Sequence, residues 1–283
     1  MITRIIPTMI ALAWMLPTHA ADITPHQPIG YCTVDPKAAK AAGFEFAEVR
    51  IREFVKLSDA DFAKYLADYR AADLPALTGF WFLPNEQKVV GPNVSTNEVE
   101  AYLEKAFDRC QQMGVKFIAW GSGGARQMPE GFSPDEAFQQ LVGFAQRMAP
   151  RAEKRGIMIL AEPLRKKESN TINSAAEALK WVEAVNHPNF QMLVDIYHMN
   201  EENEDASIIV KAGPHIRHVH MSNPIGRVFP LRAGEFDYRP FFKALSQINY
   251  RGPIAIEAKT ENLSEEGPKA MAFIRSAYAA AAE

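Results

Sequence analysis

The chain has 283 residues, 47% of them hydrophobic, which is enough for one large domain with a substantial core. A formal net charge of -3 and a pI near 6.2 give no basic stripe of the kind that nucleic-acid binders carry, so we expect no nucleic-acid partner. The two cysteines, Cys32 and Cys110, show no zinc-type spacing. Any metal site must therefore use oxygen and imidazole ligands.

The first twenty residues differ in kind from the rest. Arg4 precedes an apolar run at Ile5–Leu16, and Thr18-His19-Ala20 resembles a small-x-small cleavage site. This pattern predicts a secretory signal peptide over residues 1–20, too short for a comfortable membrane span. We expect a secreted or periplasmic protein with a mature domain at 22–283 and no stable membrane association after cleavage. An uncleaved anchor is the alternative, and a homo-oligomer is left open.

After this segment, predicted strands alternate with predicted helices. Capping residues mark several helix starts: Asp35-Pro36, Ser58, Ser95, Ser133 and Asn173-Ser174. Helices are expected from these caps and also at 205–211, 238–248 and the Ala-rich C-terminus. Strands are expected at Ile29–Thr33, Phe44–Ile51, Leu74–Leu83, Val115–Trp120, Ile157–Ala161, Phe190–Val194, Ile216–Val219 and Ile254–Ile256. Eight such repeats without a linker predict an α/β fold, a single (β/α)8 TIM barrel.

The last four predicted strands share a pattern: each runs into a residue that can bind a metal. These residues are Glu162, Asp195, His220 and Glu257. In a barrel the carboxyl ends of consecutive strands lie side by side at the mouth, so the four side chains can converge. Three carboxylates there would repel one another unless a cation or protons intervene. Such an oxygen and nitrogen set suits Mn2+, Mg2+ or Co2+. A structural role is common for a single Asp or Glu after a strand, so the evidence is the repetition.

These residues carry a family resemblance. The motifs are Glu162-Pro163-Leu164 with Glu168, Asp195-Ile196-Tyr197-His198-Met199-Asn200, His218-Val219-His220 with Gly226-Arg227, and Ile256-Glu257. They resemble the sugar isomerase/epimerase branch of the xylose-isomerase-like TIM barrels. Ketose 3-epimerases of the tagatose and psicose type show the most similar pattern, with hydroxypyruvate isomerase as a neighbour.

The resemblance implies a divalent-metal-dependent isomerase or epimerase of a small-molecule sugar, with Mn2+ preferred and Mg2+ and Co2+ as alternatives. It implies metal coordination by Glu162, Asp195, His220 and Glu257, and proton transfer at the substrate carbon by the two glutamates.

Substrate oxygens would be held by Glu168, His198 and Arg227. For His198 the alternative is a partner that orients Asp195, and for Arg227 an exposed loop cation. We read His218 and His215 as buried support.

The pattern departs from the ketose epimerases at Arg165-Lys166-Lys167, where those enzymes usually have Asn-Arg and an aromatic residue. One alternative is therefore an extracytoplasmic keto-glycoside lyase that uses the same metal and acid/base pair. A non-catalytic sugar-binding protein is another. A three-zinc abasic-site endonuclease of the same superfamily needs additional histidines, and none occurs between His26 and His187.

Overall fold

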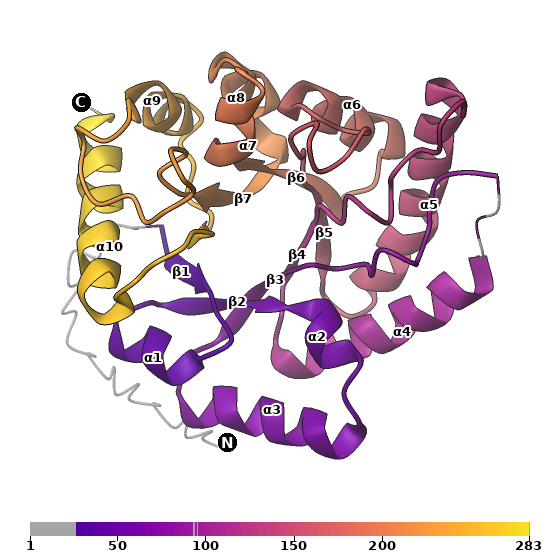
Figure 1. Cartoon of the computed structure of the whole chain (residues 1–283), viewed down its shortest axis with the longest axis horizontal. Helices are drawn as coiled ribbons and strands as arrows, with labels where there is room; N and C mark the ends of the chain where they lie inside the picture. Colours follow the sequence, from indigo (N-terminus) through magenta and orange to yellow (C-terminus); the bar gives the residue numbers. More distant parts are fainter. Residues whose placement is uncertain (1–26, 93, 95, 283) are drawn as a thin grey trace, which may run out of the picture.

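A closed barrel of eight parallel strands forms the centre of the protein, and the helices surround it (Figure 1). The computed structural model describes residues 27–92, 94 and 96–282; the expected signal peptide and the expected cap Ser95 lie outside them. The strands are β1 (Ile29–Cys32), β2 (Phe46–Arg50), β3 (Ala76–Phe80), β4 (Phe117–Trp120), β5 (Met158–Ala161), β6 (Phe190–Asp195), β7 (Ile216–Met221) and β8 (Ile254–Ile256). Each strand pairs with its sequence neighbours, and β1 pairs with β8 to close the barrel.

The helices fill the connections between strands. They are α1 (Pro36–Ala41), α2 (Ile51–Val55), α3 (Asp59–Ala71), α4 (Thr96–Met113), α5 (Pro134–Glu153), α6 (Ala175–Val185), α7 (Ile196–Glu201), α8 (Ser207–Ala212), α9 (Arg239–Gln247) and α10 (Leu263–Ala280). A 3-10 turn, Gly213–His215, precedes β7. The predicted single TIM barrel is thus confirmed. Within the described part of the chain, none of the helices has the length and apolarity needed to cross a membrane.

Side-chain caps begin several helices where the sequence predicts them. Asp35 accepts a hydrogen bond from the N–H of Ala38, and the hydroxyls of Ser58, Ser133 and Ser174 cap α3, α5 and α6 in the same way. These caps satisfy N–H groups that have no partner within the helix. Local chemistry therefore determined where these helices start.

Two short helices, α2 and α7, were not expected. Each begins directly after a strand, so no turn residue separates the two elements. Helix α7 starts because Asp195, the last residue of β6, accepts the N–H of Tyr197 at 2.7 Å. Helix α2 buries Ile51, Phe54 and Val55, a spacing typical of one helical face. Strand β3 is also shorter than predicted.

Apolar side chains close the barrel interior beneath the mouth. Phe80, Ala119, Leu160 and Leu193 form one buried cluster. Leu160 and Leu193 each stand two residues before a predicted metal ligand, so strand alternation places them one layer below those ligands. The barrel is consequently a packed core rather than a pore, and polar groups above this layer have a largely apolar floor.

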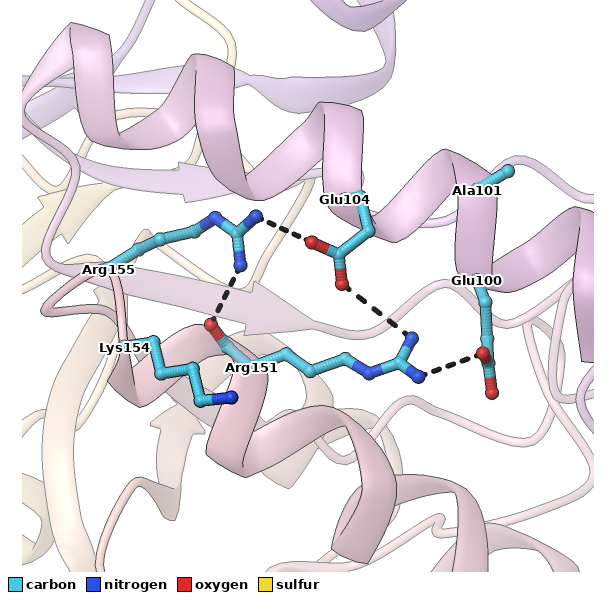
Figure 2. Close-up of a pocket in the computed structure, with 6 residues that line it drawn as sticks. All are labelled: Glu100, Ala101, Glu104, Arg151, Lys154 and Arg155. Atoms are coloured by element: carbon cyan, nitrogen blue, oxygen red, sulfur yellow. Dashed lines mark hydrogen bonds and ion pairs between the residues drawn. The ribbon is translucent and has the colours of Figure 1, made fainter.

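Ion pairs join α4 and α5 on the outer wall of the barrel. Arg151 lies 2.8 Å from Glu100, and Arg155 lies 2.5 Å from Glu104 (Figure 2). Arg155 also lies 2.7 Å from Asp108. The two arginines and the two glutamates line a surface pocket between the two helices. Because the pairs are partly exposed, each stabilises the fold by only about 0–1 kcal/mol. We assign this pocket a role in helix packing, separate from the mouth of the barrel.

Candidate metal centre and active site

The four residues that end the last four strands converge at the barrel mouth. Glu162 and Glu257 directly follow β5 and β8, Asp195 ends β6, and His220 is the penultimate residue of β7. One ligand atom from each lies within 4.8 Å of the others. An ion with bonds of about 2.1 Å holds donors up to about 4.2 Å apart, so small side-chain movements suffice to bring all four onto one cation.

His220 lies at the centre of this cluster. Its Nδ1 is 3.0 Å from Glu162 Oε1, 3.0 Å from Glu257 Oε2 and 3.9 Å from Asp195 Oδ2. Burial by itself lowers the pKa of His220, but the charges of Glu48, Glu257 and Glu162 outweigh burial and raise the pKa well above its ordinary value. The surrounding carboxylates therefore create a strong preference for positive charge at this point.

The surroundings of Glu257 also indicate a site for positive charge. Its Oε2 is 2.8 Å from the Arg227 guanidinium, and no described donor has hydrogen-bond geometry toward this buried oxygen. Burial raises the pKa of Glu257, while the charges of His220 and Arg227 lower it and prevail. A buried carboxylate oxygen that is held by charge but receives no directed N–H fits a metal ligand. The three carboxylates and one imidazole thus fit a hard or borderline divalent ion.

Arg227 contacts the cluster from the loop after β7. Besides Glu257 it lies 3.3 Å from Asp195 Oδ2, and its guanidinium stacks on the Tyr197 ring with 4.5 Å to the centroid. Its backbone has φ +52°, an uncommon conformation for a residue with a side chain. The guanidinium is thus engaged with two carboxylates of the cluster and is partly buried, unlike the exposed loop cation of the alternative interpretation.

His198 is buried beside Asp195. Its Nδ1 accepts a hydrogen bond from the N–H of Arg165 at 3.1 Å, so Nδ1 carries a lone pair and the proton belongs on Nε2. That Nε2 lies 3.7 Å from Asp195 Oδ2, beyond hydrogen-bond distance. His198 thus presents an N–H toward the cluster without being tied to Asp195. This geometry is compatible with a substrate contact and with orientation of Asp195.

Glu168 lies farther out on the rim. It pairs with Arg165 at 2.7 Å, and Arg165 also pairs with Glu201 at 2.8 Å and stacks on Tyr197, 5.0 Å from the ring centroid. The structure therefore brings Glu168 to Arg165 rather than into contact with the four ligands. The rim is thus formed by Arg165-Lys166-Lys167, the segment that departs from the ketose epimerase pattern, and by the acids that pair with Arg165.

The glycine-rich loop after β4 packs tightly against Glu162. A Cβ at Gly121 would clash with Glu162 Oε2. Arg126, fully buried, donates to the carbonyls of Gly121 at 2.5 Å, Glu162 at 2.7 Å and Thr171 at 3.1 Å. Burial lowers the pKa of Arg126 to about 10, which leaves it charged at neutral pH. Its charge supports the backbone of Glu162.

Glu48, a buried residue of β2, contacts His220 from inside the barrel and was not among the predicted site residues. The available signal was a single acid within the apolar strand segment 46–49. His218 is buried support, as predicted, with its Nδ1 at 3.0 Å from the Pro253 carbonyl. His215 differs from the prediction: it is only half-buried, lies in the turn before β7 and contacts Gln191.

The acidic and histidine cluster lies at the carboxyl ends of the strands, the face where TIM-barrel enzymes carry their active sites. Residues 36–277 match the xylose isomerase-like TIM barrel family, and the chain belongs to that family. This confirms the resemblance seen in the sequence.

Several relatives are ketose 3-epimerases. An L-ribulose 3-epimerase from Methylomonas sp. (strain DH-1) is 40% identical over 118 residues, which are 41% of this chain and 41% of that protein. The alignment thus spans about two fifths of that relative. A probable ketose 3-epimerase from Synechocystis sp. is 27% identical over 235 residues, which are 78% of this chain and 76% of that protein.

Solved structures show the same fold. A D-allulose 3-epimerase from Methylomonas sp. in complex with D-allulose has a TM-score of 0.75 at 26% identity, covering 90% of this chain and 98% of its own. A D-psicose 3-epimerase crystallised in the presence of D-fructose has a TM-score of 0.79 at 19% identity, covering 89% and 99%. At this lower identity the likeness shows the fold alone.

Proposed function

We propose that the protein is a divalent-metal-dependent epimerase or isomerase of a small keto-sugar that moves a proton at the carbon beside a carbonyl. The observation that carries the proposal is the convergence of Glu162, Asp195, His220 and Glu257 at the barrel mouth. The similarity to ketose 3-epimerases supports the substrate class. The four residues would hold Mn2+, with Mg2+ and Co2+ as alternatives, and the ion supplies Lewis-acid stabilisation of negative charge on substrate oxygens.

Glu162 and Glu257 are the proposed acid/base pair. They extend from β5 and β8, two strands that are not adjacent, and both reach His220 Nδ1 at 3.0 Å. Two carboxylates therefore face one small volume from different sides. Epimerisation needs this arrangement, because one group removes the proton from one face of the carbon and the other returns a proton to the opposite face.

Arg227 and His198 would bind substrate oxygens beside this pair. The guanidinium of Arg227 and the Nε2–H of His198 both lie near Asp195 Oδ2 and are hydrogen-bond donors. Glu168 would act from the rim, where Arg165 holds its carboxylate. We also propose that the enzyme acts after export, on the basis of the N-terminal segment.

The test is turnover of the Mn2+-loaded mature protein with a panel of ketoses in D2O. Epimerisation places solvent deuterium at one carbon of the product, and chelation of the metal should abolish it. Glu183→Gln, on the exposed part of α6, is the control for a harmless carboxylate change. Tight sugar binding without exchange or turnover for any ketose would refute the proposal in favour of a binding protein.

Elimination from a keto-glycoside is the second candidate. The charged rim built by Arg165, Glu168 and Glu201 favours it, because this rim falls on the segment that departs from the ketose epimerase pattern. Here a carboxylate would remove the proton next to the keto group, and the electrons of that C–H bond would form a double bond to the neighbouring carbon. The bond from that carbon to the aglycone oxygen would break with its electron pair on the oxygen, which takes up a proton. Release of an aglycone from 3-keto-glycosides, without epimerised ketose, would identify this reaction.

A further inference from the structure

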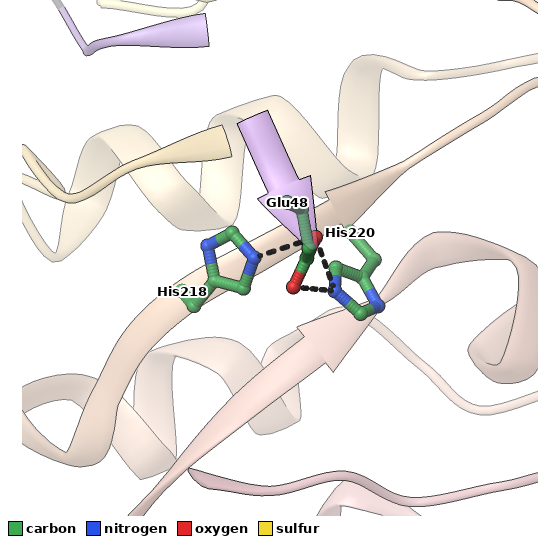
Figure 3. Close-up of side chains that lie close together, drawn as sticks. All are labelled: Glu48, His218 and His220. Atoms are coloured by element: carbon green, nitrogen blue, oxygen red, sulfur yellow. Dashed lines mark hydrogen bonds and ion pairs between the residues drawn. The ribbon is translucent and has the colours of Figure 1, made fainter. Parts of the chain in front are cut away.

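Glu48 is a carboxylate in the barrel interior with histidine partners on β7, a strand with which β2 does not pair. It extends from β2, is fully buried, and lies between His218 and His220 of β7 (Figure 3). Its oxygens are 3.3 Å from His218 Nε2 and 3.1 and 3.2 Å from His220 Nε2. One carboxyl group thus contacts both histidines of β7 inside the barrel.

The two nitrogens of His220 face different partners. Nδ1 faces the ligand carboxylates of Glu162 and Glu257, and Nε2 faces Glu48. A histidine that binds a metal through one nitrogen carries its proton on the other, and an acceptor there fixes both the tautomer and the ring orientation. Glu48 is the acceptor on the side away from the cluster.

Glu48 is itself held in place by other groups. The Cys32 thiol donates to its Oε2 at 3.3 Å, and His218 Nε2 lies 3.3 Å from the same oxygen. His218 is anchored through Nδ1 to the carbonyl of Pro253 at 3.0 Å. These contacts join β1, β2, β7 and the start of β8. A carboxylate bound on several sides has little freedom to turn away from His220.

We propose that Glu48 is a positioning residue for the metal: it holds His220 with the proton on Nε2 and with Nδ1 directed at the ion. This inference rests on the proposed metal-dependent function and adds a residue outside the four ligands. Residues that orient a metal-binding histidine in this way typically change metal affinity about 10–100-fold when they are replaced.

The same residues allow a competing interpretation, because Glu48, His218 and His220 also form a group that could hold a second ion. The contacts argue against it. All three side chains have at most 1% exposure, which leaves no open position for water, and they already contact one another at hydrogen-bond distances. A second ion would have to displace these contacts, so metal stoichiometry separates the two interpretations.

Glu48→Gln in the mature protein is the decisive variant. The amide has one acceptor oxygen for two histidines, so His220 either loses its acceptor or meets an N–H that favours the wrong tautomer. We expect Mn2+ affinity, measured by calorimetric titration of chelator-treated protein, to fall about 10–100-fold while saturation stays at one ion per chain. Glu48→Asp keeps the charge but is shorter, so it should show a smaller loss.

Val49→Ala is the matched control. Val49 is the next residue of β2, is fully buried and points to the opposite face of the strand, so its truncation lowers stability without touching Glu48. We expect a lower Tm and an unchanged Mn2+ Kd. If Glu48→Gln folds poorly, the comparison of Glu48→Asp with this control at equal Tm still decides the question.

Three results would overturn the inference: an unchanged Mn2+ Kd in both Glu48 variants, an equal loss of affinity in Val49→Ala, or two ions per wild-type chain with one lost in Glu48→Gln. None of these measurements uses a substrate. Failure of the wild-type protein to turn over any ketose would therefore refute the proposed reaction and leave the Glu48 result intact.

Discussion

The two carboxylate oxygens of Asp195 have different contacts, so two substitutions can separate helix capping from the proposed metal binding. Its Oδ1 caps α7 by accepting the Tyr197 N–H at 2.7 Å, and its Oδ2 faces the cluster, 3.3 Å from Arg227 and 3.9 Å from His220 Nδ1. Asp195→Ala removes the cap and the ligand. Asp195→Asn keeps an acceptor oxygen for the cap but removes the charge that a divalent ion requires.

The expected magnitudes follow from these contacts. Loss of an N-cap costs about 0.5–2 kcal/mol, so the metal-free Ala variant should be less stable than the metal-free Asn variant by about that amount. An ion at 100 times its Kd stabilises the native state by about 2.7 kcal/mol. For a chain of this size each kcal/mol moves Tm by about 2–4 °C, so Mn2+ should raise the wild-type Tm by about 5–10 °C. Both variants should lose most of this shift.

Scanning calorimetry of the mature protein, with chelator and then with Mn2+, measures both effects, and elemental analysis measures the bound metal. Glu183→Gln should keep the full shift. A wild-type Mn2+ shift in Asp195→Asn would show that this carboxylate does not bind the ion. Equal stability of the two metal-free variants would show that the cap contributes nothing to α7.

Three further predictions concern the acid/base pair, the support of Glu162 and export. Glu257→Gln should keep most sugar binding but lower turnover by at least ~10²–10⁴-fold, because it removes a base; deuterium exchange measures this, and an active variant would exclude Glu257 as the base. Arg126→Met removes the guanidinium donor from three carbonyls, of which Thr171 keeps the Ser169 hydroxyl as a donor. The free energy of unfolding of metal-free protein, measured by urea titration, should fall by on the order of 3 kcal/mol, and a loss below ~1 kcal/mol would contradict the supporting role. Intact mass of protein from the native compartment should show cleavage near Ala20 or Ala21, and retained Met1 in a cytoplasmic pool would contradict export.

Local sequence was sufficient for the architecture and for the four residues that meet at the barrel mouth. Glu162, Asp195 and Glu257 stand where an apolar strand ends, and this change of polarity is visible within a few residues. In a barrel, that position alone directs a side chain to the mouth. Alternation of strands and helices, with caps such as Ser58 and Ser133, located most elements for the same local reason. The short helices α2 and α7 were not predicted because no turn separates them from the strands that precede them.

Only the closed barrel determined which side chains and carbonyls contact the residues at the mouth. Glu48 lies 170 residues from His218 and 172 from His220 in the chain, and the contact exists because barrel closure lets side chains of β2 and β7 meet in the interior. Arg126 meets the carbonyl of Glu162, 36 residues away, because the loop after β4 folds over the end of β5. A strand pattern tells which face a side chain occupies, whereas barrel closure determines what lies opposite. The residues proposed to bind the metal could therefore be predicted from the chain, but the groups that contact them from other strands and loops could not.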